Sequence, residues 1–496
     1  ERMAVVVRPE DVDAFVSECN KENIDAVVVA KVTEKPNLVM HWNGETIVDL
    51  ERSFLDTNGV RVVVDAKVVD KDVKLPEERT TSAESLETDL LSLLSDLNHT
   101  SQKGLQTIFD SSVGRSTVNH PLGGRYQITP TEASVQKLPV QSGFTNTASV
   151  IAQGFHPYLA EWSPYHGAAY AVIEATARLV AAGGEWSKAR FSYQEYFERM
   201  DKKAERFGQP VSALLGSIEA QIQLGLPSIG GKDSMSGTFE ELTVPPTLVA
   251  FGVTTADSRK VLSPEFKAVG EWIYYIPGPA LSQEIDFETV KANFTQFTSL
   301  QKEHKISAAS AVKYGGVLES LALMSLGNRI GAKVNLTDLS TCLTGQLGGF
   351  VFTSKEDIPN VAKIGQTTQL FTLTVNDIDI NGLNVLNAFE GKLEAVYPTE
   401  FEQSKVLEDV PALVSDTVIK AKDTVAEPLV YIPVFPGTNS EYDSAKAFEA
   451  AGAKVNLVPF VTLDEVAIVK SVDAMVDNID KANIIFFAGG FSAADE

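Results

Sequence analysis

Blocks of apolar and polar residues alternate along the chain, and their spacing predicts a mixed α/β protein. Near the start, residues 3–8 (MAVVVR) and 25–31 (DAVVVAK) are short apolar runs that predict buried strands. Between them, Pro9 and nearby acidic residues precede a helical apolar pattern, which predicts a helix. This small α/β unit is expected to end near residue 60.

A polar segment at residues 74–85 predicts a linker. In it, Thr81 and Glu84 form a candidate capping box for the helix that follows. A long buried helix is expected at residues 168–182, because the segment is apolar nearly all round and the glycine pair 183–184 follows it.

The region from about 260 to 405 predicts a further sheet. Its apolar runs predict strands at residues 272–278, 333–336, 348–353, 370–375 and 393–398. An amphipathic helix is expected at residues 315–331, entered through Gly315 and Gly316.

The last part of the chain alternates most clearly. After a second polar linker at 418–428, three apolar runs and two helical patterns follow in βαβαβ order. This order predicts a parallel sheet with right-handed crossovers. The expected strands and helices are residues 429–435, 440–452, 454–460, 463–479 and 482–490.

Composition narrows the class of protein. The chain has 496 residues, which predicts three or four domains, and its net charge of −24 argues against a nucleic-acid or anionic-membrane partner. Cys19 and Cys342 form no disulfide or zinc pattern, so a reduced, cytoplasmic setting is expected. We find no apolar run long enough to span a membrane and no signal peptide. Both ends look cut, as in a piece of a longer protein.

The segment GLPSIGGKDSMSG, residues 225–237, is the first candidate for chemistry. It is not a Walker loop, because Gly231 stands at the lysine position and Asp233 follows Lys232. An acid beside phosphate requires a cation, and Mg²⁺ held by one or two carboxylates and the phosphates would supply it. Gly230 and Gly231 would allow backbone N–H groups to approach. A tight turn with a solvated Lys–Asp pair is the alternative, which this stretch alone favours.

Glu174 is the second candidate, because an ionised carboxylate within an apolar helix needs a partner. Arg178, four residues later, would form a helical ion pair with it. A metal shared with Asp233 is the alternative, and the two are about equally supported.

Residues 143–150 (GFTNTASV) form a third candidate, with Gly143 for backbone access and polar groups on Thr145 and Asn146. A polar loop is the simpler interpretation. Other candidates beside glycines are Asp110, Arg115 and His120. Lone histidines such as His156 and His166 are more often structural, and no Ser-His-Asp triad, HExxH or GxGxxG can be assembled.

Taken in order, five motifs resemble the large form of phosphoribosylformylglycinamidine synthase. They are ERMAVVV, FDSSVGRSTVNHPLGG, GFTNTASVIAQGFHPYLAEWSPYHGAAYAVIEA, GLPSIGGKDSMSG and VPPTLVAFGV. The last part, with PVFPGTNSEYDSAKAFEAAGA and FFAGGFSAADE, resembles the start of that family's class I glutaminase domain.

The resemblance implies an ATP- and glutamine-dependent ligase of purine synthesis. It converts formylglycinamide ribonucleotide to formylglycinamidine ribonucleotide, with ammonia supplied by the glutaminase. The implied fold is an α+β, α/β multidomain protein with one aminoimidazole-ribonucleotide-synthetase-like half and part of a flavodoxin-like sheet. This half would pair with a missing first half and with the rest of the glutaminase. The implied divisions are residues 1–70 (end of the first half), 71–104 (linker with helix), 105–258 (nucleotide-binding domain), 259–418 (C-terminal domain) and 428–496 (partial glutaminase).

The resemblance also implies functional residues. Glu174 and Asp233 would hold Mg²⁺ with an auxiliary, largely structural ATP or ADP. The implied nucleotide-binding residues are Gly230, Gly231, Lys232, Ser234, Gly143, Thr145, Asn146 and Arg178. Gly489 and Gly490 match the oxyanion region of the glutaminase. The nucleophilic cysteine would lie beyond Glu496, so no catalytic residue and no glutaminase activity are expected in this chain.

Several positions depart from the family pattern. Ser142 and Arg178 stand near an aspartate and an asparagine that bind metal in some members, which weakens a magnesium site. Arg178 would then either neutralise phosphate or pair with Glu174. Tyr314 replaces an acid, and residues 491–496 differ from the common ending. A non-catalytic nucleotide-binding scaffold is the alternative function. Another enzyme of the superfamily, such as a selenophosphate synthetase or thiamine-phosphate kinase, is disfavoured by the glutaminase-like part.

Overall fold

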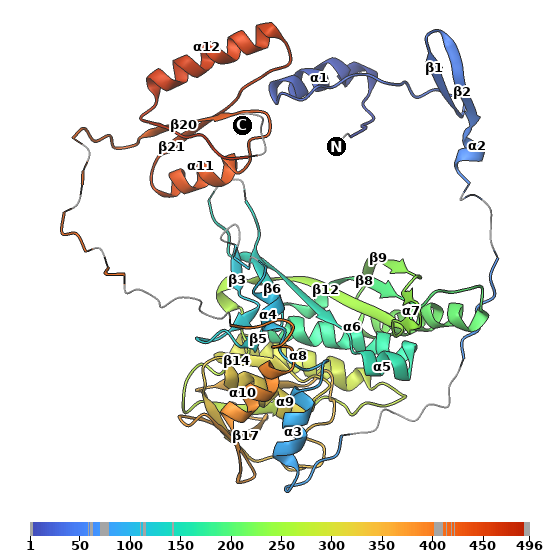
Figure 1. The fold of residues 1–496 in the computed structure, drawn as a ribbon, viewed down its shortest axis with the longest axis vertical. Helices are drawn as coiled ribbons and strands as arrows, with labels where there is room; N and C mark the ends of the chain where they lie inside the picture. Colours follow the sequence, from blue (N-terminus) through green and yellow to red (C-terminus); the bar gives the residue numbers. More distant parts are fainter. Residues whose placement is uncertain are drawn as a thin grey trace. The chain divides into compact units, whose positions relative to one another are not determined.

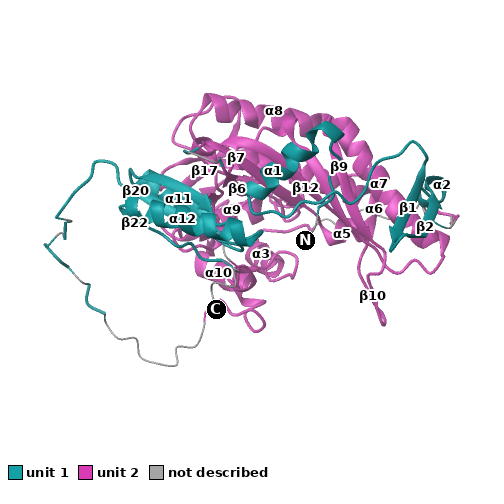
Figure 2. Ribbon diagram, turned by 90° about the horizontal axis from the view of Figure 1, so that it is seen from above, with its two compact units in different colours: residues 1–62, 140–144, 407–496 teal, residues 63–139, 145–406 magenta. Residues whose placement is uncertain are grey.

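The computed structural model divides the chain into two compact units, coloured separately in Figure 2. The smaller unit comprises residues 1–62, 140–144 and 407–496, and the larger comprises residues 63–139 and 145–406. The structure describes residues 3–57, 59, 63–69, 79–109, 111–112, 116–140, 143–400, 410–412, 414–417, 419–420 and 422–490. Asp110, Arg115, Ser142 and the ending 491–496 lie outside these residues.

A six-stranded sheet forms one layer of the larger unit (Figure 1). Its order is β3 (Thr117–Asn119), β6 (Ser134–Lys137), β7 (Thr147–Gly154), β12 (Thr247–Asp257), β8 (Arg190–Tyr196) and β9 (Ser228–Ser234). The pairs β6–β7, β7–β12 and β12–β8 are antiparallel, whereas β8 and β9 pair in parallel. The GGKDS segment, expected as a loop, is therefore the edge strand β9, whose backbone pairs with one neighbour.

The long buried helix is confirmed as α6 (Pro164–Ala181), with the side chain of Ser163 as its N-cap. Gly183 ends it with φ of +95°. Gly154 at the end of β7 allows close packing, because a Cβ there would lie 2.0 Å from the Ala171 carbonyl oxygen. The helices α5 (Pro157–Trp162) and α7 (Ala204–Leu224) pack beside α6.

A seven-stranded sheet forms the other main layer. Its order is β14 (Ile306–Ala311), β16 (Phe350–Ser354), β13 (Trp272–Ile276), β17 (Ala362–Thr368), β15 (Gly331–Val334), β18 (Thr372–Val375) and β19 (Ile378–Asn381). Four of the five predicted strands fall in this sheet. The fifth, at residues 393–398, is wrong, since these residues form turns after a helix.

Two apolar cores lie on opposite faces of this second sheet. Tyr274 faces the core shared with α6 and α8 (Phe287–Glu303), whereas the adjacent Ile273 faces the second core. The second core also contains α9 (Gly316–Leu326). Every residue of α9 is buried, so its predicted amphipathic character is wrong and the helix lies within the core. The remaining helices of this core are α3 (Leu86–Leu94) and α10 (Gly382–Gly391).

The predicted capping box is not formed. Helix α3 begins at Leu86 with Ser85 as N-cap, and no side chain caps it. The Thr81 hydroxyl instead donates to Asp89 at 2.6 Å. The short elements of the larger unit are α4 (Lys103–Gln106), the ladder of β4 (Leu122–Gly123) with β5 (Thr129–Pro130), the ladder of β10 (Thr238–Phe239) with β11 (Leu242–Thr243), and the 3-10 turns Trp186–Lys188 and Ser258–Lys260.

The predicted βαβαβ order is confirmed in the smaller unit. Three parallel strands lie in the order β21 (Lys454–Pro459), β20 (Leu429–Val434) and β22 (Ile484–Ile485). The helices α11 (Glu441–Ala450) and α12 (Glu465–Lys481) complete the crossovers.

The first residues differ from their prediction. The helix is confirmed as α1 (Val12–Lys21) after a 3-10 turn at Pro9–Asp11, but residues 3–8 and 25–31 form no strand. Val6 and Val29 are 88% and 85% exposed. A strand needs a neighbouring ladder for its backbone groups, and these runs pair with no strand among the described residues. The other elements here are the hairpin of β1 (Asn37–Trp42) with β2 (Glu45–Glu51) and α2 (Arg52–Leu55).

Among the described residues, no helix combines the length and apolar character that a membrane crossing requires.

Candidate functional site

The edge strand β9 carries the first candidate site. Gly230 has φ of +140°, and a Cβ on Gly231 would lie 2.8 Å from the Tyr193 carbonyl oxygen, so the backbone here approaches β8 closely. Beside it lies an open hollow of about 380 Å³. The hollow is lined by Ser192, Tyr193, Gln194, Ile229, Gly230, Gly231, Lys232 and Phe251. Three of the predicted nucleotide-binding residues, Gly230, Gly231 and Lys232, therefore line this hollow together with residues of the neighbouring strand β8.

Asp233 lies directly opposite Glu195 in the β8–β9 ladder. Asp233 is exposed, whereas Glu195 is buried and its Oε1 has no hydrogen-bond partner among the described residues. Burial, followed by the charge of Asp233, raises the pKa of Glu195 to about 7. Sequence reasoning missed Glu195, because the parallel ladder that joins it to Asp233 connects segments far apart in the chain.

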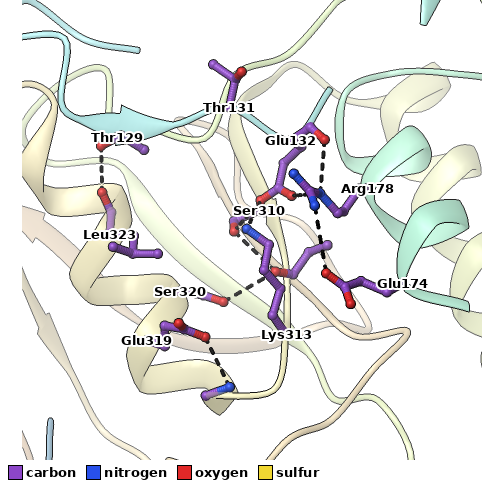
Figure 3. Close-up of polar contacts among 12 residues, drawn as sticks. Thr129, Thr131, Glu132, Glu174, Arg178, Ser310, Lys313, Glu319, Ser320 and Leu323 are labelled. Atoms are coloured by element: carbon purple, nitrogen blue, oxygen red, sulfur yellow. Dashed lines mark hydrogen bonds and ion pairs between the residues drawn. The ribbon is translucent and has the colours of Figure 1, made fainter. Parts of the chain in front are cut away.

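Glu174 and Arg178 belong to a buried ion network, shown in Figure 3. Arg178 lies between Glu174, with Nη1 3.8 Å from Oε1, and Glu132, with Nε 3.4 Å from Oε2. Its Nε also donates to the Glu132 carbonyl oxygen and its Nη1 to that of Gln153. The helical ion pair considered from the sequence is thus present, and the guanidinium makes two ion pairs and two hydrogen bonds to backbone carbonyls.

Glu132 is the centre of this network and was not found from the sequence. Its side chain is 2% exposed, and its Oε1 accepts from the Ser310 hydroxyl at 2.8 Å and lies 3.3 Å from Lys313 Nζ. Glu132 lies between β5 and β6, while Ser310 is on β14 and Lys313 follows it. The network therefore joins the two layers of the larger unit. Burial raises the pKa of Glu174 to about 7, against the opposing charges of Arg178 and Lys313.

The two predicted metal ligands lie on different elements, Glu174 on helix α6 and Asp233 on the edge strand β9. Arg178 binds the backbone of β7, and β9 is three strands away, on the order of 14 Å in a sheet. The described residues contain no group of three or more histidine, cysteine or acidic side chains arranged to hold a metal. Two cations of the protein, Arg178 and Lys313, also act on the Glu174 carboxylate. These residues do not fit a metal ion there, whereas Asp233 is an exposed carboxylate without an ion pair among the described residues.

The third candidate lies at another end of the same sheet. Asp257 pairs with Thr147, whereas Phe251 pairs with Ser192, which lies opposite Gly230. Asp257 and Phe251 are six residues apart on β12, which corresponds to about 20 Å along the strand. The structure therefore does not bring Thr145 and Asn146 together with β9. The Thr145 hydroxyl accepts from the Thr147 N–H at 3.0 Å, and the Asn146 carbonyl accepts from Ser258. Gly143, in the smaller unit, has φ of +69°.

A histidine cluster borders α9. His99 Nδ1 lies 2.6 Å from Glu319 Oε1, and the ring of His156 stacks on Tyr314 at 3.9 Å between centroids. Burial alone would lower the pKa of His99, but the charge and hydrogen bond of Glu319 raise it above its ordinary value. Burial, then the charge of His99, lowers the pKa of His156 to about 3. Tyr314, which replaces an acid of the family pattern, is thus an aromatic packing partner here.

The other two candidate histidines, His166 and His120, have structural contacts. His166 lies 2.8 Å from the Ser163 hydroxyl and 2.9 Å from the Gln283 carbonyl oxygen. The exposed His120 lies 3.4 Å from the Ser111 hydroxyl. Both interactions agree with the structural interpretation of lone histidines.

In the smaller unit, the glycine pair of the predicted oxyanion region contacts the loop after β20. Asn439 N–H donates to the Gly489 carbonyl at 2.9 Å, and Gly490 bridges Thr438. A Cβ on Gly490 would lie 2.2 Å from the Gly437 carbonyl oxygen, so no side chain fits there. The oxyanion role of these glycines stays a prediction.

Comparison with known families first gives the class. Residues 427–496 match the CobB/CobQ-like glutamine amidotransferase domain, and residues 1–43 match the C-terminal domain of AIR synthase related protein. The two ends of the chain are thus similar to a synthetase-related domain and to a glutamine amidotransferase domain, in the order that the motifs predicted.

The curated proteins that resemble this chain include several named phosphoribosylformylglycinamidine synthase subunit PurL. The chain is 25% identical over 367 residues to that of Picrophilus torridus, covering 70% of this chain and 48% of the relative. It is 26% identical over 365 residues to that of Streptomyces avermitilis, covering 68% and 46%. The chain therefore spans about half the length of the curated relatives it matches. The solved structure of T. maritima PurL complexed with ATP aligns with 16% identity and a TM-score of 0.49, covering 74% of this chain and 54% of that one.

Proposed function

We propose that this chain is part of a phosphoribosylformylglycinamidine synthase. In this proposal it contributes the second synthetase half and the start of the glutaminase domain to the ATP- and glutamine-dependent amidation of formylglycinamide ribonucleotide. The observation that carries it is the order of the matched segments along one chain. A synthetase C-terminal segment comes first, the similarity to the synthase subunits covers about 70% of the chain, and an amidotransferase segment comes last.

The nucleotide in this half is proposed to bind at β9. The backbone N–H groups of Gly230 and Gly231 border the hollow, and Lys232 would add a positive charge toward phosphate. Ser234, one residue beyond Asp233, would add a hydroxyl donor. Asp233 would be the protein carboxylate on a Mg²⁺ ion, which would offset the phosphate charge. Thr145, Asn146 and Gly143 remain predicted contacts that this location does not use.

The role of this nucleotide is proposed to be structural. The hollow at β9 is open, and Glu195, opposite Asp233 on the neighbouring strand, lies buried without a basic partner among the described residues. Such a site suits retention of a nucleotide better than its turnover. We therefore expect no glutamate release from glutamine and no ADP formation by this chain in isolation.

Genetic rescue tests the proposed function. A bacterial strain that requires purines because it lacks this synthase would receive the complete natural gene, including the first half and the rest of the glutaminase that the proposal requires. Growth without purines is expected, together with formation of the amidine product from formylglycinamide ribonucleotide, ATP and glutamine in the extract. Soluble protein without rescue and without the product would contradict the proposal. Rescue that persists when the β9 site is abolished would mean that this half is a scaffold whose nucleotide is dispensable.

A further inference from the structure

The buried ion network around Glu132 provides an inference that does not depend on the proposed function. Two carboxylates, Glu132 and Glu174, are held in the interior by two cations of the chain itself, Arg178 and Lys313. Buried acids in such a cluster need either bound metal or protein cations to remain charged. The contacts of Arg178 indicate that protein cations, and not a bound metal ion, balance the charge of these two acids.

Arg178 has the geometry of an internal counter-ion. Its Nε and Nη1 groups contact two carboxylates and two backbone carbonyl oxygens, from α6, the segment before β6, and β7. A guanidinium bonded in this way presents a fixed charge at the point where a divalent ion would have to sit. Lys313 brings a second charge to Glu132 from the other layer of the unit.

We propose that Arg178 and Lys313 replace a divalent metal at the joint between the two sheets of the larger unit. The joint is then held by protein cations and needs no Mg²⁺. Glu174 is a positioning residue for Arg178 in this arrangement and does not bind metal. Any metal-bridged nucleotide in this half depends on Asp233 instead.

The test is thermal unfolding of the full chain in EDTA and in millimolar Mg²⁺, with wild type, Arg178→Gln and Glu174→Gln. Wild type is expected to unfold at the same temperature in both solutions. Arg178→Gln leaves two buried acids without their shared cation, so its Tm in EDTA should fall by about 5 °C or more. Mg²⁺ should then restore part of that loss, because the variant opens a place for the ion.

Arg206→Gln is the matched control. Arg206 also pairs with two acids, Glu198 and Asp201, but on α7 and away from the joint. Its variant should not acquire a response to Mg²⁺.

A wild-type Tm that rises with Mg²⁺, and a Glu174→Gln variant that has lost this rise, would overturn the proposal. A rise that survives in Glu174→Gln would place the ion outside the joint, and the joint would still need no Mg²⁺. If Arg178→Gln does not fold, this comparison of wild type with Glu174→Gln still decides the question.

Discussion

At the scale of single residues, Glu132 is the acid that joins two cations in the ion network of the larger unit. It lies between Arg178 and Lys313 and has almost no solvent exposure. An acid in this position is costly to remove, because the partly buried Lys313 would lose its carboxylate partner and Arg178 would lose one of its two. Sequence reasoning could find the Glu174–Arg178 pair from its helical spacing, but not Glu132, whose partners come from separate segments.

Glu132→Gln is therefore expected to lower the free energy of unfolding by about 3 kcal/mol. Glutamine keeps the shape but not the charge. Urea unfolding of both proteins measures the difference. Glu185→Gln is the control, since its pair with Lys188 is exposed and such pairs contribute under about 1 kcal/mol. Equal losses in the two variants would show that the network contributes no more than a surface pair.

His156 should make the unfolding free energy depend on pH. Its pKa is lowered to about 3 in the folded protein, so the ring stays neutral where the unfolded chain, near pKa 6.5, takes up a proton. The stabilisation is complete above pH 6.5 and is lost as the pH falls toward 3. Between pH 6.5 and 5 this loss is about 2 kcal/mol.

His156→Phe keeps an aromatic ring against Tyr314 but cannot bind the proton. Unfolding curves in urea at pH 5, 6 and 7 should show the variant losing less stability on acidification than wild type, by about 2 kcal/mol at pH 5. Parallel losses in the two proteins would mean that His156 is protonated in the fold.

At the scale of elements, the contact between β7 and α6 depends on Gly154. A Cβ at this position would meet the backbone of α6 at 2.0 Å, and neither backbone can move without disturbing the core. Gly154→Ala should cost about 3 kcal/mol in unfolding free energy. Gly391→Ala, at the end of α10 with open space around it, should cost nothing or stabilise slightly. A harmless Gly154→Ala would contradict the tight packing described.

The elements also show where sequence patterns suffice. Long periodic segments such as α6 and the βαβαβ order after Leu429 could be predicted, because local patterns and chain order determine them. The exposed valines of residues 3–8 and 25–31 have the pattern of strands, yet a strand also depends on its neighbours. The pattern of α9 suggested one polar face, whereas its glutamate is buried in a pair with His99. The sequence of β9 predicts a loop, because its glycines hide a strand pattern.

At the scale of the whole molecule, the two units differ in the size of their cores. Among the described residues, the core cluster of the smaller unit consists of Val430 and Ile432 on β20 and Ala445 on α11, whereas the larger unit has two extensive clusters. The smaller unit should therefore open at lower free energy. Hydrogen exchange followed by mass spectrometry should show faster exchange in β20–β22 than in β7 and β12. Equal protection of both sheets would contradict this expectation.

We propose that the larger unit binds a metal-bridged nucleotide at β9 and not at Glu174. Calorimetric titration with Mg-ADP of wild type, Asp233→Ala and Glu174→Gln measures this binding. Wild type and Glu174→Gln are expected to bind, and Asp233→Ala is expected not to bind. Binding that Glu174→Gln loses and Asp233→Ala keeps, or no binding by wild type, would contradict it.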